Sequence, residues 1–215
     1  MSLQLKNISL SLNGKPLIAP LALEIAAGEI VTVMGPSGCG KSSLLSYIAG
    51  DLGAPLNGQG DVILNGNIMN TIRPEHRRIG RLFQDDLLFP HMTVGENLLF
   101  AIQRGPRNER ETMMKTALQR AELEGFENRP PHTLSGGQRS RISLMRTLLA
   151  KPEAMLLDEP FSKLDRTLRS TIRNYTFEHL RARNIPTLLM THDIGEAPDG
   201  GRILHITEIG EVKHV

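Results

Sequence analysis

The sequence predicts an α/β fold in which a parallel sheet is combined with an N-terminal antiparallel β region and an inserted all-helical lobe. Short apolar runs of the buried-strand type recur at 29–34, 154–160 and 185–193, with helical patterns between them. The first thirty residues instead alternate apolar and polar side chains, as half-buried strands do. Helical patterns dominate from about 94 to 150, so the insertion interrupts the α/β core.

The N-terminal alternation predicts two strands separated by a turn at Asn13–Gly14. The next strand, at 29–34, runs directly into a glycine-rich loop. The helix after this loop is expected to end at Gly50, because glycine favours the residue that follows a helix. Further strands are predicted at "DVILNG" and at 78–84.

Within the insertion, Asn108 and Glu111 have the spacing of a capping pair and predict a helix that begins at Asn108. Pro130–Pro131 indicates a bend or loop. A helix near 166–183 then connects the last two buried strands. The chain is expected to close with a hairpin over "RILHIT" and "GEVKHV".

The length, net charge and cysteine count of the chain exclude several classes of protein. A chain of 215 residues fits one domain with an inserted lobe, and we expect a core of 1–85 and 151–215 around a lobe of about 86–150. A formal net charge of +2 gives no indication of a nucleic-acid partner. The single cysteine, Cys39, excludes a disulfide within the chain. Because neither a leader segment nor a run of about 18 apolar residues is present, we expect a cytoplasmic location.

The segment "GPSGCGKS" at 35–42 matches the phosphate-binding pattern G-x-x-x-x-G-K-[ST] in full. Its glycines allow backbone N–H groups to close around a phosphate. Lys41 is expected to pair with the outer phosphates and the Ser42 hydroxyl to bind Mg²⁺. Since a predicted strand precedes the segment and a predicted helix follows it, a chance glycine-rich turn is a poor alternative.

The segment "MLLDE" at 155–159 ends an apolar run with two carboxylates. Ligands bind at the carboxyl edge of parallel sheets, so Asp158 is expected to hold Mg²⁺ through water and Glu159 to act as a general base. Gln84 and His192 also follow predicted strands. A glutamine can reach Mg²⁺ and the attacking water, and a histidine can contact the γ-phosphate and carry a proton. Each signal is weak alone, because such residues are often surface or core polar groups.

A second anion site is predicted where "LSGGQ" at 134–138 opens a long helical pattern. A helix that begins with Ser-Gly-Gly presents backbone N–H groups and the positive end of its dipole. The residues alone do not say why one chain needs two such sites.

The motifs "GPSGCGKSS", Gln84, "LSGGQ", "MLLDEP", "SKLD" and His192 occur in the order and spacing of ATP-binding-cassette ATPases. The sequence resembles the ATP-binding subunits of ABC transporters over nearly all its length, especially importer subunits of the iron, polyamine, sulfate or thiamine type. The resemblance implies a P-loop NTPase (RecA-like) core. It also implies a head-to-tail homodimer, in which the P-loop of one subunit and the "LSGGQ" of the other enclose one ATP.

The resemblance assigns roles to individual residues. It implies Glu159, His192 and Gln84 as catalytic residues, and Ser42, Gln84 and Asp158 as Mg²⁺ ligands. Asp165 ends a loop that crosses the dimer interface. The ATP contacts implied in the same subunit are Gly35, Pro36, Ser37, Gly38, Cys39, Gly40, Lys41, Ser42 and Ser43. Those implied in trans are Ser135, Gly136, Gly137 and Gln138.

Three positions depart from the family pattern. The family usually has an aromatic residue near position 12 to stack on adenine, whereas this chain has Leu12. Lys163 of "SKLD" replaces a commoner alanine and is expected to place a bulky charge at the dimer interface. Pro198 and Gly200–Gly201 lie where a short helix normally runs.

The function implied is ATP hydrolysis that drives a membrane transporter, with permease subunits and a solute-binding protein as partners. The candidate residues for the permease groove, expected between core and lobe, are Phe83, Asp85, Phe89, Pro90 and His91. Ordinary packing within the lobe is the alternative for these five. The rival functions are a soluble ABC ATPase acting on nucleic acid or ribosomes, and a P-loop kinase of small metabolites. The transported solute is not encoded in these motifs.

Overall fold

The computed structural model describes residues 1–207 and 210–214, and the chain divides into two compact units. Unit 1 contains Met1–Arg81, Glu153–Glu159 and Phe177–Val215. Unit 2 contains Leu82–Pro152 and Pro160–Thr176. The division expected from the sequence, into a core of 1–85 and 151–215 and a lobe of about 86–150, stays a prediction.

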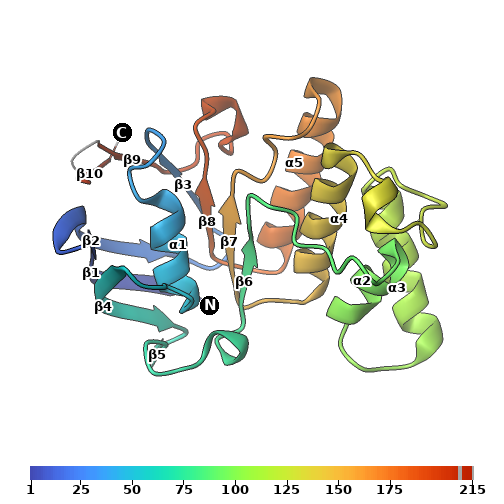
Figure 1. The fold of residues 1–215 in the computed structure, drawn as a ribbon, viewed down its shortest axis with the longest axis horizontal. Coiled ribbons are helices and arrows are strands. Elements are labelled where there is room, and N and C mark those ends of the chain that lie inside the picture. Colours follow the sequence, from blue (N-terminus) through green and yellow to red (C-terminus); the bar gives the residue numbers. More distant parts are fainter. Residues whose placement is uncertain (208–209, 215) are drawn as a thin grey trace. The chain divides into compact units, whose positions relative to one another are not determined.

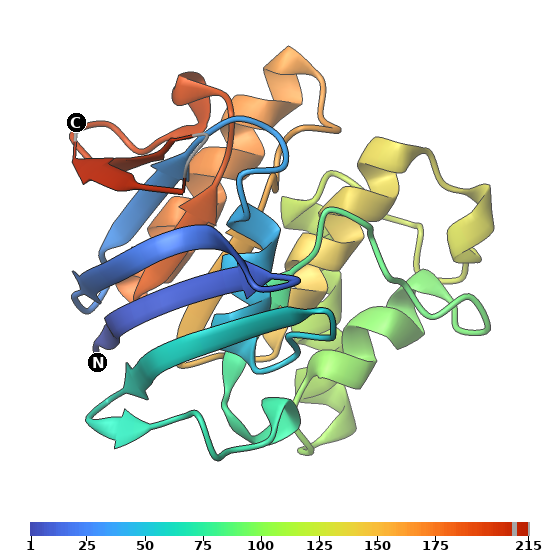
Figure 2. The ribbon, with the colours of Figure 1, turned by 60° about the vertical axis from the view of Figure 1, so that its left-hand side comes forward.

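Unit 1 is built on two sheets (Figure 1). The first sheet has the order β2-β1-β4-β5, and its strands pair antiparallel (Figure 2). Its bounds are β1 Leu3–Leu12, β2 Lys15–Ile25, β4 Leu56–Leu64 and β5 Asn67–Ile68. The turn between β1 and β2 is Asn13–Gly14, as predicted, with both residues at positive φ.

The second sheet has the order β10-β9-β3-β8-β7-β6. Its bounds are β3 Ile30–Met34, β6 Ile79–Leu82, β7 Ala154–Asp158, β8 Thr187–Met190, β9 Ile203–Ile206 and β10 Val212–His214. Strand β3 pairs in parallel with β8 and β9, and β8 pairs in parallel with β7. The predicted C-terminal hairpin is confirmed by the antiparallel pairing of β9 and β10.

Helix α1, Lys41–Ala49, follows β3 and packs into a buried core shared with both sheets. Leu44, Leu45 and Ile48 of this helix are fully buried beside the inward residues of β1, β3 and β7. Gly50 ends the helix at φ 88, where its N–H bonds to the carbonyl oxygens of Ser46 and Tyr47. This core fixes α1 against the strand edge at which the predicted motifs lie.

Unit 2 is mainly helical. Its helices are α2 Val94–Ala101, α3 Arg107–Arg120 and α4 Gly136–Leu149. Helix α5, Arg166–Ala182, begins in unit 2 and ends in unit 1. Three short 3-10 helices complete the description: η1 Pro74–His76, η2 Pro131–Thr133 and η3 Ile194–Glu196.

The predicted capping pair in α3 is wrong. The helix begins at Arg107 with Pro106 at its N-cap, so Asn108 lies inside the first turn. Glu111 instead forms an (i, i+4) ion pair with Arg107, at 2.7 Å. Proline suits this boundary because its fixed φ is compatible with a helix start, and that local effect outweighs the cap of the asparagine.

In the part of the chain that the structure describes, every helix is too short or too polar to span a bilayer.

Candidate nucleotide-binding site

The loop 35–40 connects β3 to α1 and depends on its glycines. Gly38 and Gly40 have φ of 82 and 96, a region that side chains with a Cβ rarely adopt. A Cβ at Gly35 would lie only 2.7 Å from the carbonyl oxygen of Ile206. The loop therefore folds back tightly against β9 and directs its backbone toward the start of α1.

The N-terminus of α1 has the features of an anion site. Its N-cap is Gly40, which has no side chain to accept from the first-turn N–H groups, and no acidic residue lies in that turn. Lys41 is buried, and its ammonium donates to the carbonyl oxygens of Gly35 and Pro36 at 2.7 and 2.8 Å. These bonds hold the lysine across the loop and leave one of its three hydrogens for a ligand.

Asp158 ends β7 and is buried beside the loop. Burial raises the pKa of its carboxyl group, and a hydrogen bond from the Ser42 hydroxyl and the charge of Arg81 partly oppose that shift. A carboxylate and a hydroxyl in hydrogen-bond contact form an oxygen donor pair suited to Mg²⁺. Among the residues that the structure describes, no group of three His, Cys, Asp or Glu side chains could hold a metal.

Arg81 is a residue that the sequence reasoning missed. Its guanidinium donates to Asp51 at 2.7 Å, to the Ser46 hydroxyl at 2.9 Å and to the Ser42 carbonyl at 3.3 Å. The side chain is only 9% exposed, and its charge acts on Asp158. Arg81 therefore holds α1 in place beside the Asp158 carboxylate. Its position in an ordinary strand gave no signal of this role.

Glu159 and His192 form a pair at the same edge. Glu159 Oε1 and His192 Nδ1 lie 3.0 Å apart, with the glutamate 19% and the histidine 66% exposed. Glu159 has φ +47, an unusual conformation for a residue other than glycine. Its N–H donates to the Met190 carbonyl at 2.9 Å, which ties the strained residue to β8. The side chain thus points to the loop that carries His192.

The loop after β8 is fixed by a buried contact. Thr191 donates its hydroxyl hydrogen to the carboxylate of Glu196, at 2.7 Å, and accepts from the Asp193 N–H at 3.1 Å. Glu196 is 2% exposed. Where the sequence suggested a missing helix, the structure has the single 3-10 turn η3. His192 is therefore presented from a short, anchored turn.

The expected adenine platform is aliphatic. Leu12, at the end of β1, is 40% exposed and pairs in register with Lys15. The next strand covers the phosphate loop, because a Cβ at Gly40 would lie 3.0 to 3.1 Å from side-chain atoms of Leu17 and Ile18. No aromatic residue precedes Tyr47 in the chain.

The second predicted anion site, at the start of α4 in unit 2, is capped by its own side chains. Ser135 accepts from the Gln138 N–H at 3.3 Å, and Gln138 Oε1 accepts from the Ser135 N–H at 2.8 Å. This capping box contrasts with the bare start of α1, because it leaves mainly Gly136 and Gly137 to offer N–H groups. Gln84 also belongs to unit 2, where its carbonyl accepts from Lys163 at 2.7 Å.

An exposed aromatic group lies in unit 2. The rings of Phe89 and Phe100 are 4.8 Å apart, edge to face, and His91 lies 6.1 Å from Phe89. Arg146 stacks over Phe89 at 5.2 Å. Phe100 is 64% exposed, and the sequence reasoning missed it because it lies within an ordinary helical pattern.

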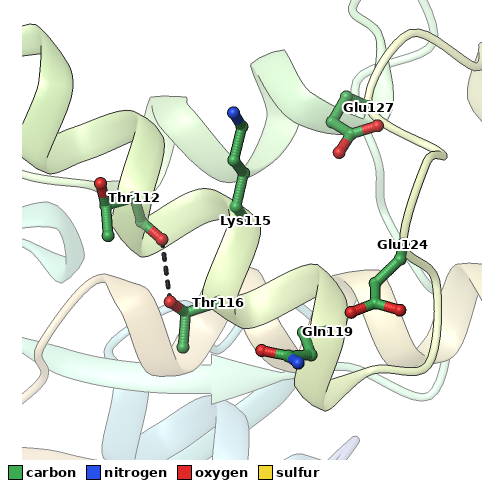
Figure 3. Close-up of a pocket in the computed structure, with 6 residues that line it drawn as sticks. All are labelled: Thr112, Lys115, Thr116, Gln119, Glu124 and Glu127. Atoms are coloured by element: carbon green, nitrogen blue, oxygen red, sulfur yellow. Dashed lines mark hydrogen bonds between the residues drawn. The ribbon is translucent and has the colours of Figure 1, made fainter.

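A shallow hollow of about 360 Å³ lies elsewhere in unit 2 (Figure 3). Its lining is Thr112, Lys115, Thr116, Gln119, Glu124 and Glu127. The Thr116 hydroxyl donates a hydrogen bond to the Thr112 carbonyl, at 2.9 Å. None of the sequence motifs contributes a residue to this hollow.

The chain is similar to several known proteins. A sequence profile described as "ABC transporter" matches residues 18–162. The uncharacterized ABC transporter ATP-binding protein YnjD of Escherichia coli (strain K12) is 43% identical over 207 residues, which are 96% of this chain and 95% of that protein. The Fe(3+) ions import ATP-binding protein FbpC of Mesorhizobium japonicum is 43% identical over 184 residues, 84% of this chain but 50% of that protein.

Among solved structures, the dimeric post-hydrolysis state of the ATP-binding cassette MJ0796, bound to ADP and Pi, is similar with a TM-score of 0.86 and 32% identity. The alignment covers 99% of this chain and 97% of that chain. The predicted fold is therefore confirmed: an α/β phosphate-loop core with an antiparallel β region and a helical part.

Proposed function

Since the chain belongs to the ABC transporter family, we propose that it binds and hydrolyses ATP to drive a membrane permease that imports a small solute. The observation that carries the proposal is the convergence in unit 1 of three features: the uncapped start of α1, the buried Asp158 and the Glu159–His192 pair. The iron import ATP-binding protein FbpC among the relatives supports the direction of transport.

In this proposal the loop 35–43 binds the phosphates. Backbone N–H groups at the start of α1 donate to phosphate oxygens, and Lys41 adds an ammonium hydrogen that its two loop carbonyls leave available. Ser42 and Asp158 would hold Mg²⁺, and Gln84 stays the further oxygen ligand that the sequence predicts. Bound Mg²⁺ neutralises charge that develops on the phosphates.

Glu159 and His192 activate the attacking water. The Glu159 carboxylate accepts a proton from water as it attacks, and the hydrogen bond to His192 orients that carboxylate. The strained φ of Glu159 is held by β8, so the carboxylate is positioned before substrate arrives. His192, being the more exposed member, contacts the γ-phosphate.

A second copy of the chain completes the site. The start of α4 offers two glycine N–H groups and a capped serine, but no lysine or carboxylate from the phosphate chemistry is in its turn. As the resemblance to ABC ATPases implies, we assign Ser135–Gln138 to the ATP of the partner copy, in a two-fold arrangement with two equal sites. The dimeric state of MJ0796 supports this assignment.

The permease binds the exposed aromatic group of unit 2. Phe83, Asp85, Phe89, Pro90 and His91 remain the candidates from the sequence, and Phe100 is added because it is the most exposed ring that contacts one of them. Exposed aromatic rings are typical anchors of protein interfaces. A solute-binding protein is expected outside the membrane, as a partner of the permease.

Membrane fractionation of the native organism tests the transport assignment. The wild-type chain is expected to sediment with membranes, whereas Phe100→Asp shifts to the soluble fraction with its ATPase activity unchanged. Ile68→Asp is the control, because Ile68 is 53% exposed but belongs to unit 1. Recovery of the wild-type chain with ribosomes or nucleic acid instead would support the rival function.

A further inference from the structure

Three short segments of unit 2 meet at the carboxylate of Asp86. They are the turn that carries Gln84, the start of α4 with its Ser135 cap, and the loop before α5 that contains Lys163. Asp86 is the common partner, and its side chain is only 12% exposed. The three segments are separated by about fifty and thirty residues in sequence, so only tertiary packing brings them together.

Lys163 connects two of these segments. Its ammonium donates to the Gln84 carbonyl at 2.7 Å and pairs with Asp86 Oδ1 at 3.3 Å. The lysine side chain is 35% exposed, so its charge is partly withdrawn from solvent. The charge that the sequence suggested would lie at a dimer interface is thus engaged within its own unit.

Arg139 connects the same carboxylate to α4. Its Nε lies 3.3 Å from Asp86 Oδ2, and its Nη1 donates to the Leu134 carbonyl at 2.6 Å. Each oxygen of Asp86 therefore receives one cation from a different segment. Removing either cation leaves the other ion pair intact, and removing Asp86 breaks both ion pairs, while the bond from Lys163 to the Gln84 carbonyl does not depend on that carboxylate.

The backbone is equally close. A Cβ at Gly137 would lie 2.9 Å from the Lys163 carbonyl oxygen, a distance that a side chain does not tolerate. The first turn of α4 thus rests directly on the loop that holds Lys163. A displacement of either segment must move the other, because no space separates them.

We propose that Lys163 is a positioning residue that links Gln84, through Asp86 and Arg139, to the start of α4. The inference rests on the proposed function, in which Gln84 serves the Mg²⁺ and the water of one ATP while Gly136 and Gly137 bind the ATP of the partner copy. When the partner's ATP engages α4, the linked ion pairs fix Gln84 in its working position. The two ATP sites of the dimer are thereby coupled through this triad.

Replacement of the lysine tests the link. Lys163→Met removes the charge and keeps the length, and we expect the maximal ATPase rate to fall about fivefold or more, with the KM for ATP and the melting temperature nearly unchanged. Lys163→Arg should restore most of the rate, because it keeps a cation within reach of Asp86. Lys115→Met, an exposed lysine on α3 outside the triad, is the matched control.

A double-mutant cycle tests the route. If Lys163 acts through Asp86, the chain with Lys163→Met and Asp86→Asn is no slower than the slower single variant. Multiplied effects of the two substitutions, or a wild-type rate in Lys163→Met, would overturn the proposal. An inactive wild-type chain would instead contradict the proposed function, so the two failures are distinguishable.

Discussion

At the scale of single residues, the proposed chemistry depends on Glu159. Its φ of +47 is held by one backbone bond to Met190, and its carboxylate is oriented by His192. A conformation of this kind costs about 1–3 kcal/mol in a residue other than glycine. The fold therefore holds a strained backbone conformation at the residue whose carboxylate is proposed to accept the proton.

Glu159→Gln is expected to bind ATP and to lower turnover by about 10²–10⁴-fold, or about 3–5 kcal/mol of barrier, because the amide accepts no proton from water. Steady-state ATPase assays and ATP titration measure the two effects. Glu153→Gln is the control, since Glu153 precedes the same strand and pairs with Arg78. A variant that runs as a monomer with ATP in gel filtration would count against the two-copy site.

Leu12 sets the second prediction at this scale. Base stacking on an aromatic ring contributes about 1–3 kcal/mol, and an aliphatic side chain lacks the ring face. We expect GTP hydrolysis within about tenfold of ATP hydrolysis, a difference below about 1.4 kcal/mol. Leu12→Tyr should tighten ATP binding with little change in maximal rate, because the base is bound equally in ground and transition states.

Competition titration with ATP, GTP and a base-free triphosphate measures the discrimination directly. Ile68→Tyr is the control, as it adds a ring at another exposed position of the same sheet. A hundredfold preference of the wild-type chain for ATP would show that another residue reads the base.

At the scale of elements, two helix starts differ although both are predicted anion sites. Helix α1 begins at a glycine without a cap, whereas α4 begins with a complete capping box. The bare start suits a bound phosphate that supplies the missing acceptor. The capped start is stable before any partner arrives, which suits a site that is completed by another copy.

Ser135→Ala and Thr93→Ala each remove a capping box in unit 2, from α4 and α2 respectively. Each substitution should lower the free energy of unfolding by about 1 kcal/mol, measured by urea denaturation. Only Ser135→Ala is expected also to weaken the ATP-driven dimer of the Glu159→Gln chain, since Thr93 has no assigned contact with nucleotide. If both substitutions weakened the dimer equally, Ser135 would act only as a helix cap and not as a nucleotide contact.

At the scale of the whole molecule, the proposed function gives the chain two halves of two different ATP sites. Lys41 and the Glu159–His192 pair belong to unit 1, and Ser135 to unit 2. If these halves serve different nucleotides, a single lesion damages both sites of a homodimer. A mixed dimer can concentrate two lesions in one site.

A mixture of Lys41→Ala and Ser135→Arg chains is therefore expected to regain ATPase activity above either variant alone. In the heterodimer both lesions fall on one ATP, and the other site keeps a native Lys41 and a native Ser135. Activity is measured across mixing ratios, with heterodimers quantified by differently tagged chains. Heterodimers without recovered activity would contradict the trans assignment.

Most elements of the fold were predictable because their signals are local. Gly50 ends α1 and Asn13–Gly14 turns β1 into β2, since both depend on backbone conformations that glycine or asparagine adopts. The phosphate loop was predictable for the same reason. The start of α3 was not, because Pro106 and the Arg107–Glu111 pair compete locally with the asparagine cap.

The sequence by itself determined the identity of the motif residues and the loop-to-helix geometry of 35–42, because these depend on residues close together in the chain. The tertiary structure decided which distant residues meet. Strand β3 lies between β8 and β9 and β8 lies beside β7, so Asp158 meets Ser42 of the loop and Glu159 meets His192. The bracing by Arg81 and the pairing of Lys163 with Asp86 follow from contacts across about thirty to eighty residues. Hydrophobic periodicity records which face is buried but not its partner, so such contacts appear only when the sheets and helices pack.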